Sequence, residues 1–181
     1  MSADLEREAT AGAVRRSIRD VPDFPKPGIL FKDITPVLLD SALFARTTEA
    51  MAAPFRAGRI SHVVAIESRG FILGAPVAQA LGAAFVPVRK PGKLPSRTVR
   101  EAYALEYGTD ALEMHADALR GAGNVLVVDD VLATGGTAAA TCRLVEQVGA
   151  RVTACAFLVE LAFLGGRARL GERRVEALVA Y

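Results

Sequence analysis

A pair of adjacent acids followed by a glycine-containing loop is the part of this sequence whose residue types and spacing best suit chemistry. Asp129 and Asp130 follow the apolar run 125–128, and two residues later comes the loop Ala133-Thr134-Gly135-Gly136-Thr137. Glycines let the backbone curl so that successive N–H groups point inward, and the positive end of a helix behind the loop attracts anions. The loop therefore predicts a phosphate site. The carboxylates beside it can accept hydrogen bonds from vicinal hydroxyls, so the motif indicates a phosphorylated sugar.

Other phosphate-binding loops fit the sequence less well. A P-loop ends in Gly-Lys-Ser/Thr and a dinucleotide-binding loop has the pattern Gly-x-Gly-x-x-Gly, and neither follows any predicted strand. A further alternative involves no ligand, since the acids could cap a helix while the glycines form a turn. That explanation is adequate for either half of the motif, but a buried strand, an acid pair and this loop in succession favour the phosphate site.

The composition limits the class of protein. With 181 residues, 51% of them hydrophobic, the chain can bury one substantial core as a single domain. A net charge of +2 is too small to indicate a protein that binds nucleic acid or a membrane surface. The charged N-terminal segment contains no apolar signal core, and no apolar run approaches the ~18 residues that span a bilayer. Cys142 and Cys155 match no metal or redox spacing, so we expect free thiols in a cytoplasmic protein.

Strands and helices are expected to alternate through most of the chain. The predicted strands are 62–66, 84–88, 125–128, 152–159 and 175–179, and the predicted helices between them are 71–81 and 138–148. Pro87 places its strand at an edge or a bulge, because proline cannot donate to a central ladder. This order indicates an α/β fold with a mainly parallel twisted sheet covered by helices on both faces. Ligands bind such sheets at the carboxyl ends of the strands.

The N-terminal part is expected to differ from this pattern. Leu5, Ala9, Val14 and Ile18 fall on one face of a predicted first helix. The segment 21–28 ends that helix because it contains three prolines and a glycine. A short extended piece at 29–31 follows, and a second helix is predicted from Ser41, as its N-cap, to about Arg56.

Two further motifs follow predicted strands and would lie at the same edge of the sheet. After 62–66 comes Glu67-Ser68-Arg69-Gly70, where an arginine at a helix start can hold an anionic oxygen. After 84–88 comes Arg89-Lys90-Pro91-Gly92-Lys93, whose three cations suit a loop facing a polyphosphate, although most basic loops are only solvated surface. Segments 101–106 and 111–115 are expected to form a hairpin around a turn at 107–110. The whole segment 90–115 would form a mobile lid that excludes water.

These motifs resemble the phosphoribosyl-pyrophosphate signature of type I phosphoribosyltransferases, and more closely the adenine phosphoribosyltransferase family within that group. The resemblance covers about residues 15–181, through the segments 25–36, 67–71, 89–95, 105–108 and 159–161. It implies the type I phosphoribosyltransferase fold as one domain over 1–181, with an N-terminal helix and base-binding hood at 1–36. It also implies a cis peptide bond between Glu67 and Ser68.

The activity implied by this resemblance is transfer of the phosphoribosyl group from phosphoribosyl pyrophosphate to adenine, giving AMP and pyrophosphate. In the family, the loop 133–137 holds the 5-phosphate, Asp129 and Asp130 bind the ribose hydroxyls, and the acid matching Glu106 handles a proton at the purine N7. The resemblance assigns pyrophosphate binding to Ser68, Arg69, Arg89, Lys90 and Lys93, and adenine binding to Leu30, Phe31, Lys32 and Leu161. Mg²⁺ would be held mainly by phosphoribosyl pyrophosphate and water, and the protein would be a homodimer.

Two other functions remain open at this point. A phosphoribosyltransferase for hypoxanthine, xanthine or orotate would share the phosphate loop and differ in the segments that contact the base. In a 6-oxopurine enzyme the Lys32 ammonium would donate to the 6-oxo group, whereas backbone groups at 30–32 would recognise adenine. A regulator that only senses phosphoribosyl pyrophosphate would carry a DNA-binding module, and the about twenty residues before the proline-rich segment are too few for a winged helix.

Overall fold

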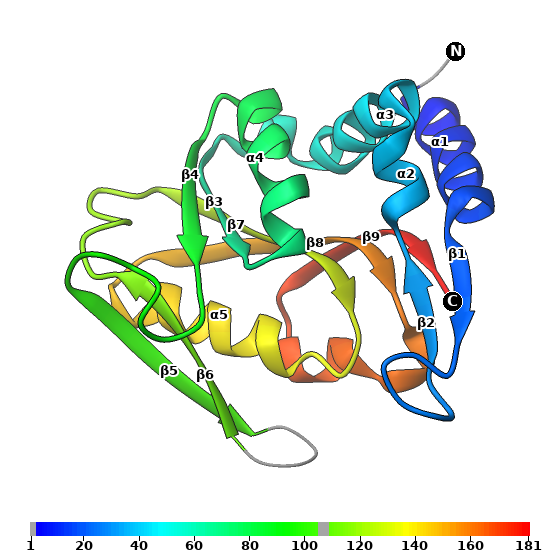
Figure 1. Ribbon diagram of the computed structural model, residues 1–181. Coiled ribbons are helices and arrows are strands. Elements are labelled where there is room, and N and C mark those ends of the chain that lie inside the picture. Colours follow the sequence, from blue (N-terminus) through cyan, green and yellow to red (C-terminus); the bar gives the residue numbers. More distant parts are fainter. Residues whose placement is uncertain (1–2, 105–108) are drawn as a thin grey trace. The chain divides into compact units, whose positions relative to one another are not determined.

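The computed structural model describes residues 3–104 and 109–181 of the chain. These residues form two compact units, Met1–Ala50 and Met51–Tyr181 (Figure 1). No helix among the described residues is long and apolar enough to cross a membrane.

The larger unit is built on a five-stranded sheet in which every neighbouring pair of strands is parallel. The strands are β3 (Ile60–Ile66), β4 (Ala84–Val88), β7 (Asn124–Leu132), β8 (Arg151–Glu160) and β9 (Arg174–Ala180). Their order across the sheet is β4-β3-β7-β8-β9. All five predicted strands are confirmed, and Pro87 lies on the edge strand β4, where the missing N–H interrupts no central ladder.

Helices α4 (Arg69–Leu81) and α5 (Gly136–Gln147) cover opposite faces of this sheet (Figure 1). Helix α4 can approach β3 closely because Gly74 has no side chain, and a Cβ atom there would clash with the methyl group of Ala65. On the other face, Val64 of β3 belongs to one buried cluster with Ala140 and Leu144 of α5. Alternate residues of the central strands therefore pack against different helices, which explains why these strands are apolar throughout.

A hairpin of β5 (Thr98–Ala104) and β6 (Thr109–His115) packs beside α5. The predicted hairpin is confirmed, but Thr109 and Asp110, which were predicted to lie in the turn, belong to β6. Residues 105–108, which include the rest of the predicted turn, lie outside the described residues. Tyr103, Leu112 and Met114 belong to the same buried cluster as α5. Arg89 and Glu113 exchange two backbone hydrogen bonds, of 2.9 and 2.7 Å, so the basic loop after β4 starts against β6. The described part of the predicted lid thus rests on the core.

Three short 3-10 helices complete the larger unit. They are η1 (Ala53–Gly58) before the sheet, and η2 (Ala162–Leu164) and η3 (Gly166–Leu170) between β8 and β9. Sequence periodicity predicts none of them, because segments of three to six residues are too short to show a period.

The smaller unit contains α1 (Ala3–Ser17), the antiparallel strands β1 (Arg19–Pro22) and β2 (Leu30–Asp33), and α2 (Thr35–Leu39). The predicted first helix is confirmed, but only part of its predicted apolar face is buried. Val14 and Ile18 are buried together with Thr10, whereas Leu5 is 55% exposed. The predicted extended piece at 29–31 corresponds to β2, while β1 and α2 were not predicted.

The second predicted helix, α3 (Ser41–Ala52), differs from the prediction at both ends. Its N-cap is Asp40, not Ser41, because Asp40 has an extended backbone and its Oδ1 accepts a hydrogen bond from the N–H of Leu43 at 2.9 Å. The helix ends at Ala52 and not near Arg56, because Pro54 cannot continue it and instead lies in the first turn of η1.

Candidate active site

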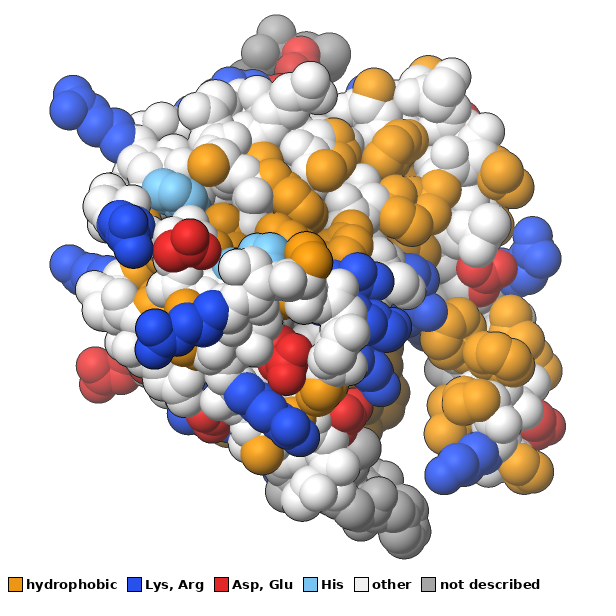
Figure 2. Space-filling view, turned by 60° about the vertical axis from the view of Figure 1, so that its left-hand side comes forward, with side chains coloured by type: hydrophobic (Ala, Val, Ile, Leu, Met, Phe, Trp, Pro, Cys, Tyr) orange, Lys and Arg blue, Asp and Glu red, His pale blue; other side chains and the backbone are white. Residues whose placement is uncertain are grey.

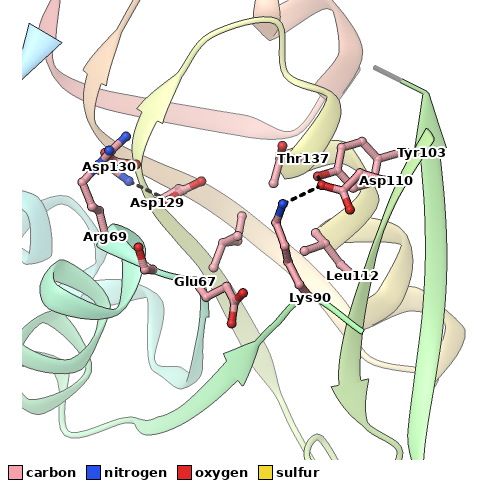
Figure 3. A pocket seen from close by; sticks show the side chains of 11 residues that line it. Glu67, Arg69, Lys90, Tyr103, Asp110, Leu112, Asp129, Asp130 and Thr137 are labelled. Carbon is pink, nitrogen blue, oxygen red and sulfur yellow. Dashed lines mark hydrogen bonds and ion pairs between the residues drawn. The ribbon is translucent and has the colours of Figure 1, made fainter. Parts of the chain in front are cut away.

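Three of the predicted motifs meet at the carboxyl ends of neighbouring parallel strands. Segment 67–70 follows β3, segment 89–93 follows β4, and the acid pair with its loop ends β7. A cavity of about 490 Å³ opens where they meet (Figure 3). Its lining residues are Ile66, Glu67, Ser68, Arg69, Lys90, Tyr103, Asp110, Leu112, Asp129, Asp130 and Thr137.

The sequence suggested that the two acids follow the strand. In the structure both belong to the last part of β7, which runs to Leu132. The carboxylate of Asp130 is buried and paired with the Nε of Arg69, in the first turn of α4. The Oδ1 atom of Asp129 accepts a hydrogen bond of 2.9 Å from the N–H of Asp130. Gly70 lets α4 come this close, since a Cβ there would lie 2.7 Å from Oδ1 of Asp129. Strand β7 and the start of α4 therefore place both acids and one arginine together.

Asp129 is the acid whose ionisation the site disfavours. Burial, followed by repulsion from the carboxylate of Asp130, raises the pKa of Asp129 well above its ordinary value. Such a shift at a cavity wall is typical of functional sites, because a charge held out of water interacts strongly with whatever charge appears beside it.

This raised pKa predicts an effect on stability. An acid with a higher pKa in the folded chain than in the unfolded chain destabilises the fold when ionised, and the destabilisation disappears as the pH falls. We therefore expect Asp129→Asn to raise the Tm at pH 7, because the amide oxygen can still accept from Asp130 while the buried charge is gone. The gain should shrink as the pH falls through the folded-state pKa and vanish below the unfolded-chain value of about 3.9.

Thermal unfolding of the wild type and the variant across this pH range measures the effect, with exposed Asp117→Asn as the control. A lower Tm for Asp129→Asn at pH 7 would contradict the prediction, because it would mean that the ionised carboxylate stabilises the fold.

Glu67 organises two of the predicted pyrophosphate ligands. Its buried carboxylate accepts hydrogen bonds from Nε of Arg89 at 2.8 Å and from Nζ of Lys93 at 2.7 Å. Burial raises the pKa of Glu67, but the hydrogen bonds from Lys93 and Arg89 outweigh it and leave that pKa below its ordinary value. Arg89 and Lys93 are consequently not among the described residues that line the cavity.

Lys90 reaches the cavity itself and pairs with Asp110 of β6 across 3.0 Å (Figure 3). The contact with Lys90 lowers the pKa of Asp110, and the same contact raises the pKa of Lys90, so both groups stay ionised. The hydroxyl of Tyr103 lies 3.4 Å from the carboxylate of Asp110. Tyr103, Asp110 and Leu112 also line the cavity, although no motif in the sequence marks them as site residues. Only the hairpin register, which pairs Tyr103 with Asp110, brings them to the cavity.

The predicted phosphate loop forms a second, smaller hollow of about 70 Å³. It is lined by Asp129, Val131, Leu132, Ala133, Thr134, Gly135, Gly136, Thr137 and Ala138. Gly135 adopts a φ of +80° immediately before α5, so the first turn of this helix opens toward the loop. Because Asp129 and Thr137 line both hollows, the phosphate loop and the larger cavity adjoin, as the sequence predicts for a phosphorylated sugar.

The remaining predicted site residues lie in different places. Ser68 lines the cavity, and the peptide bond between Glu67 and Ser68 is cis, as the resemblance implied. Leu161 follows β8 and donates its N–H to the carbonyl of Leu132 at 2.9 Å. Glu106 lies outside the described residues.

The predicted adenine ligands Leu30, Phe31 and Lys32 belong to the smaller unit, on strand β2. The ring of Phe31 meets that of Phe24 edge to face, with centroids 5.1 Å apart. The ammonium of Lys32 lies 2.6 Å from the carboxylate of Asp20 and its side chain is 10% exposed.

The sequence matches the family model for the phosphoribosyl transferase domain over residues 38–175. A relative from Anaeromyxobacter sp. (strain Fw109-5), named adenine phosphoribosyltransferase, is 58% identical over 181 residues, which cover 100% of this chain and 99% of the relative. The solved structure of adenine phosphoribosyltransferase from Thermoanaerobacter pseudethanolicus matches with a TM-score of 0.91 at 49% identity, covering 94% of this chain and 99% of that chain. The enzyme from Saccharomyces cerevisiae, solved with an imino-altritol bisphosphate and adenine, matches with a TM-score of 0.89 at 40% identity, covering 94% and 98%. The chain belongs to the adenine phosphoribosyltransferase family.

Proposed function

We propose that this protein transfers the 5-phosphoribosyl group from phosphoribosyl pyrophosphate to adenine, giving AMP and pyrophosphate in purine salvage. The observation that carries the proposal is the pair of adjoining hollows that share Asp129 and Thr137. One hollow offers a helix start and a glycine loop for the 5-phosphate. The other offers cations for the pyrophosphate, together with both acids for the ribose, and Asp129 lies where the two hollows adjoin.

The charges of the site suit the way in which this bond breaks. As pyrophosphate leaves, positive charge develops on the ribose C1 and ring oxygen, while negative charge builds on the departing oxygens. Arg69 and Lys90 at the cavity would stabilise the departing oxygens. Asp129 and Asp130 would hold the ribose hydroxyls, and the developing cation would favour the ionised form of Asp129, which burial otherwise disfavours.

The predicted pyrophosphate cations are all bound to carboxylates in this structure. Arg69 pairs with Asp130, Lys90 with Asp110, and both Arg89 and Lys93 with Glu67. We infer that pyrophosphate binds by replacing some of these carboxylates. The side chains of Lys90 and Lys93 are 57% and 49% exposed and can turn toward a ligand at little cost in packing.

Magnesium fits the donor set of the site, since carboxylate and phosphate oxygens are the hard ligands that this ion prefers. Among the described residues no three His, Cys, Asp or Glu side chains converge as a ready cage. We therefore propose that Mg²⁺ is held mainly by phosphoribosyl pyrophosphate and water, close to the cavity acids. When bound, it would neutralise charge on the leaving pyrophosphate.

Adenine is the base that the observations favour. The Lys32 ammonium, which a 6-oxopurine enzyme would use as a donor, is already bound to Asp20 and nearly buried. We propose that backbone groups of residues 30–32 recognise N1 and N6 of adenine, and that Phe31 and Leu161 pack against the ring. By its resemblance to the family, Glu106 would handle the proton at N7. The adenine complex of the Saccharomyces cerevisiae relative supports this choice of base.

Incubation with phosphoribosyl pyrophosphate, Mg²⁺ and each purine base in turn, followed by identification of the nucleotide formed, tests the proposal. AMP from adenine is the expected product. IMP or XMP as the preferred product would replace it with a 6-oxopurine activity, and failure to form any nucleotide would leave a sensor of phosphoribosyl pyrophosphate.

A pair of substitutions tests how the base is recognised. Lys32→Ala is expected to keep the preference for adenine over hypoxanthine. A site whose buried polar groups pair with the correct base can make the ratio of the two kcat/KM values about 10⁴. Phe31→Ala should instead raise the KM for adenine roughly tenfold, because the apolar and stacking contact is lost. Steady-state kinetics with both bases measures the two effects. Loss of the preference in Lys32→Ala would assign base recognition to the Lys32 side chain.

We further propose that the protein works as a cytoplasmic homodimer. Cys142 and Cys155 are free and buried with their Sγ atoms 3.7 Å apart, which suits a reducing compartment. On the larger unit, Ile72 of α4 and Phe85 of β4 are 42% and 37% exposed, and hydrophobic side chains gather on the face shown in Figure 2. Exposed apolar side chains of this size favour burial by a second copy.

A further inference from the structure

The 3-10 helix η3 lies against the phosphate loop through two glycines. Gly166, the first residue of η3, is buried, and a Cβ atom on it would clash with the carbonyl oxygen of Ala133. The same Cβ would lie 3.1 Å from the N of Gly135. In the other direction, a Cβ on Gly135 would clash with the carbonyl oxygen of Gly166. The backbone of the phosphate loop therefore rests directly on the backbone of η3.

The need for glycine at position 166 comes from this contact and not from the backbone conformation. Gly166 is not among the glycines with a positive φ, whereas its neighbour Gly165 has a φ of +64° and nothing within 4 Å of its Cβ position. An alanine at 166 would thus fit its own backbone and meet only the loop. An alanine at 165 would strain its own backbone and meet nothing.

An ion pair between Arg167 and the buried carboxylate of Glu160 holds η3 in place. Arg167 donates two parallel hydrogen bonds to the carboxylate of Glu160, with Nε and Nη2 each 2.7 Å from its oxygens. Its third nitrogen, Nη1, donates to the carbonyl of Val175 in β9 at 2.9 Å. The Glu160 side chain is only 8% exposed, at the end of β8. A planar arginine held by three such bonds has little freedom, so the residue before it is fixed as well.

The other end of η3 is anchored in the core. Leu170 is fully buried in the cluster that contains the α5 residues, and η3 contacts α5, the helix that follows the phosphate loop (Figure 1). The segment 165–170 is therefore fixed to β8, β9 and α5 at once, and it presents Gly166 to the loop. A loop that must hold N–H donors to within about 0.5 Å of the productive geometry needs a support of this kind.

We propose that Gly166, fixed by the Arg167–Glu160 ion pair, is a positioning residue for the 5-phosphate site. Gly166 does not touch the ligand itself. It supports the backbone at Ala133 and Gly135, so that the N–H groups at the start of α5 point at the phosphate. The proposal rests on the proposed function only in placing a sugar phosphate on this loop. It makes residues 160, 166 and 167 determinants of affinity for that phosphate.

Binding of ribose 5-phosphate and of pyrophosphate, measured separately by isothermal titration calorimetry, tests the proposal. Gly166→Ala is expected to weaken ribose 5-phosphate binding at least about tenfold, because the loop must move away from η3. Pyrophosphate binding should change by less than about twofold, since its cations lie on other loops. Gly165→Ala is the matched control: it should lower the Tm through backbone strain and leave ribose 5-phosphate affinity unchanged.

The ion pair gives a second series that does not depend on the glycine variant folding. Arg167→Lys, which keeps the charge but loses the paired hydrogen bonds, is expected to weaken ribose 5-phosphate binding by roughly three- to tenfold. Arg169→Lys, at an exposed position on the same 3-10 helix, should have no effect. A role limited to stability would lower the Tm in Arg167→Lys and leave both affinities as in the wild type.

Two results from the variants would overturn the proposal. One is unchanged ribose 5-phosphate affinity in folded Gly166→Ala or, if that variant does not fold, in Arg167→Lys. The other is an equal loss of affinity for ribose 5-phosphate and pyrophosphate. Failure of the wild type to form AMP would instead overturn the proposed function, while ribose 5-phosphate binding would still report on the support. A wild type that binds no ribose 5-phosphate would remove the phosphate site and this proposal with it.

Discussion

Replacing both Asp129 and Asp130 by asparagine should lower kcat/KM at least about 100-fold while the chain still folds, because each lost charge-assisted hydrogen bond is worth roughly 1.5–3 kcal/mol. An amide keeps the size of the side chain but loses the negative charge and part of its strength as an acceptor. Both carboxylates line the cavity where the ribose is expected, so both losses fall on the same step.

The single variants should separate the two acids. Asp130→Asn also loses the ion pair with Arg69, so Arg69 is released from this carboxylate to bind the leaving group, and the variant should lower turnover while strengthening pyrophosphate binding. Asp129→Asn leaves that pair in place and should act mainly on kcat. Steady-state kinetics with Asp117→Asn as an exposed control, together with circular dichroism of each variant, measures this. Wild-type activity in the folded double variant would exclude both acids from the mechanism.

The second large effect is expected at Gly135. Gly135→Ala should lower kcat/KM for phosphoribosyl pyrophosphate by about 100-fold or more, chiefly by raising its KM, because a Cβ there displaces the loop. Two causes add at this position: the φ of +80° disfavours any side chain, and the new Cβ would clash with the carbonyl oxygen of Gly166. The displaced loop would no longer aim its N–H groups at the 5-phosphate.

Gly149 provides the matched control for this substitution. It follows α5, has a φ of +81°, and has nothing within 4 Å of its Cβ position. Gly149→Ala should therefore cost the same backbone strain of about 1–2 kcal/mol and lower the Tm similarly, with kcat/KM nearly unchanged. If the Tm fell equally in both variants and both kept their activity, the phosphate loop would not depend on its contact with Gly166.

The sequence by itself determined the parallel sheet and the phosphate loop. Apolar runs of four to eight residues, separated by helical segments, predicted all five strands of the sheet, and Pro87 predicted an edge or a bulge for β4. The acid pair and the glycines likewise predicted a loop at a strand end, and Gly135 has the positive φ that such a loop requires. These features could be predicted because each depends on residues that are close together in the chain.

Short or capped elements were predicted less well. Strand β1 and helix α2 have four and five residues, which is too few to show a period, and neither was predicted. The start of α3 was placed one residue late because Ser41 and Asp40 are both good N-caps. Asp40 is the N-cap because its backbone is extended, as this position requires.

Only the tertiary structure decided which partners the charged residues have. Glu67 binds Arg89 and Lys93, which are 22 and 26 residues away in the sequence. Two residues predicted to bind pyrophosphate are therefore bound to a carboxylate in this structure. The contact between Gly135 and Gly166 was equally invisible, because it joins two loops that follow different strands. The local sequence of a basic loop or a lone glycine is the same whether the segment faces solvent or packs against a neighbouring segment. The choice is made by sheet order and helix packing, which bring distant segments together and remove water from between them.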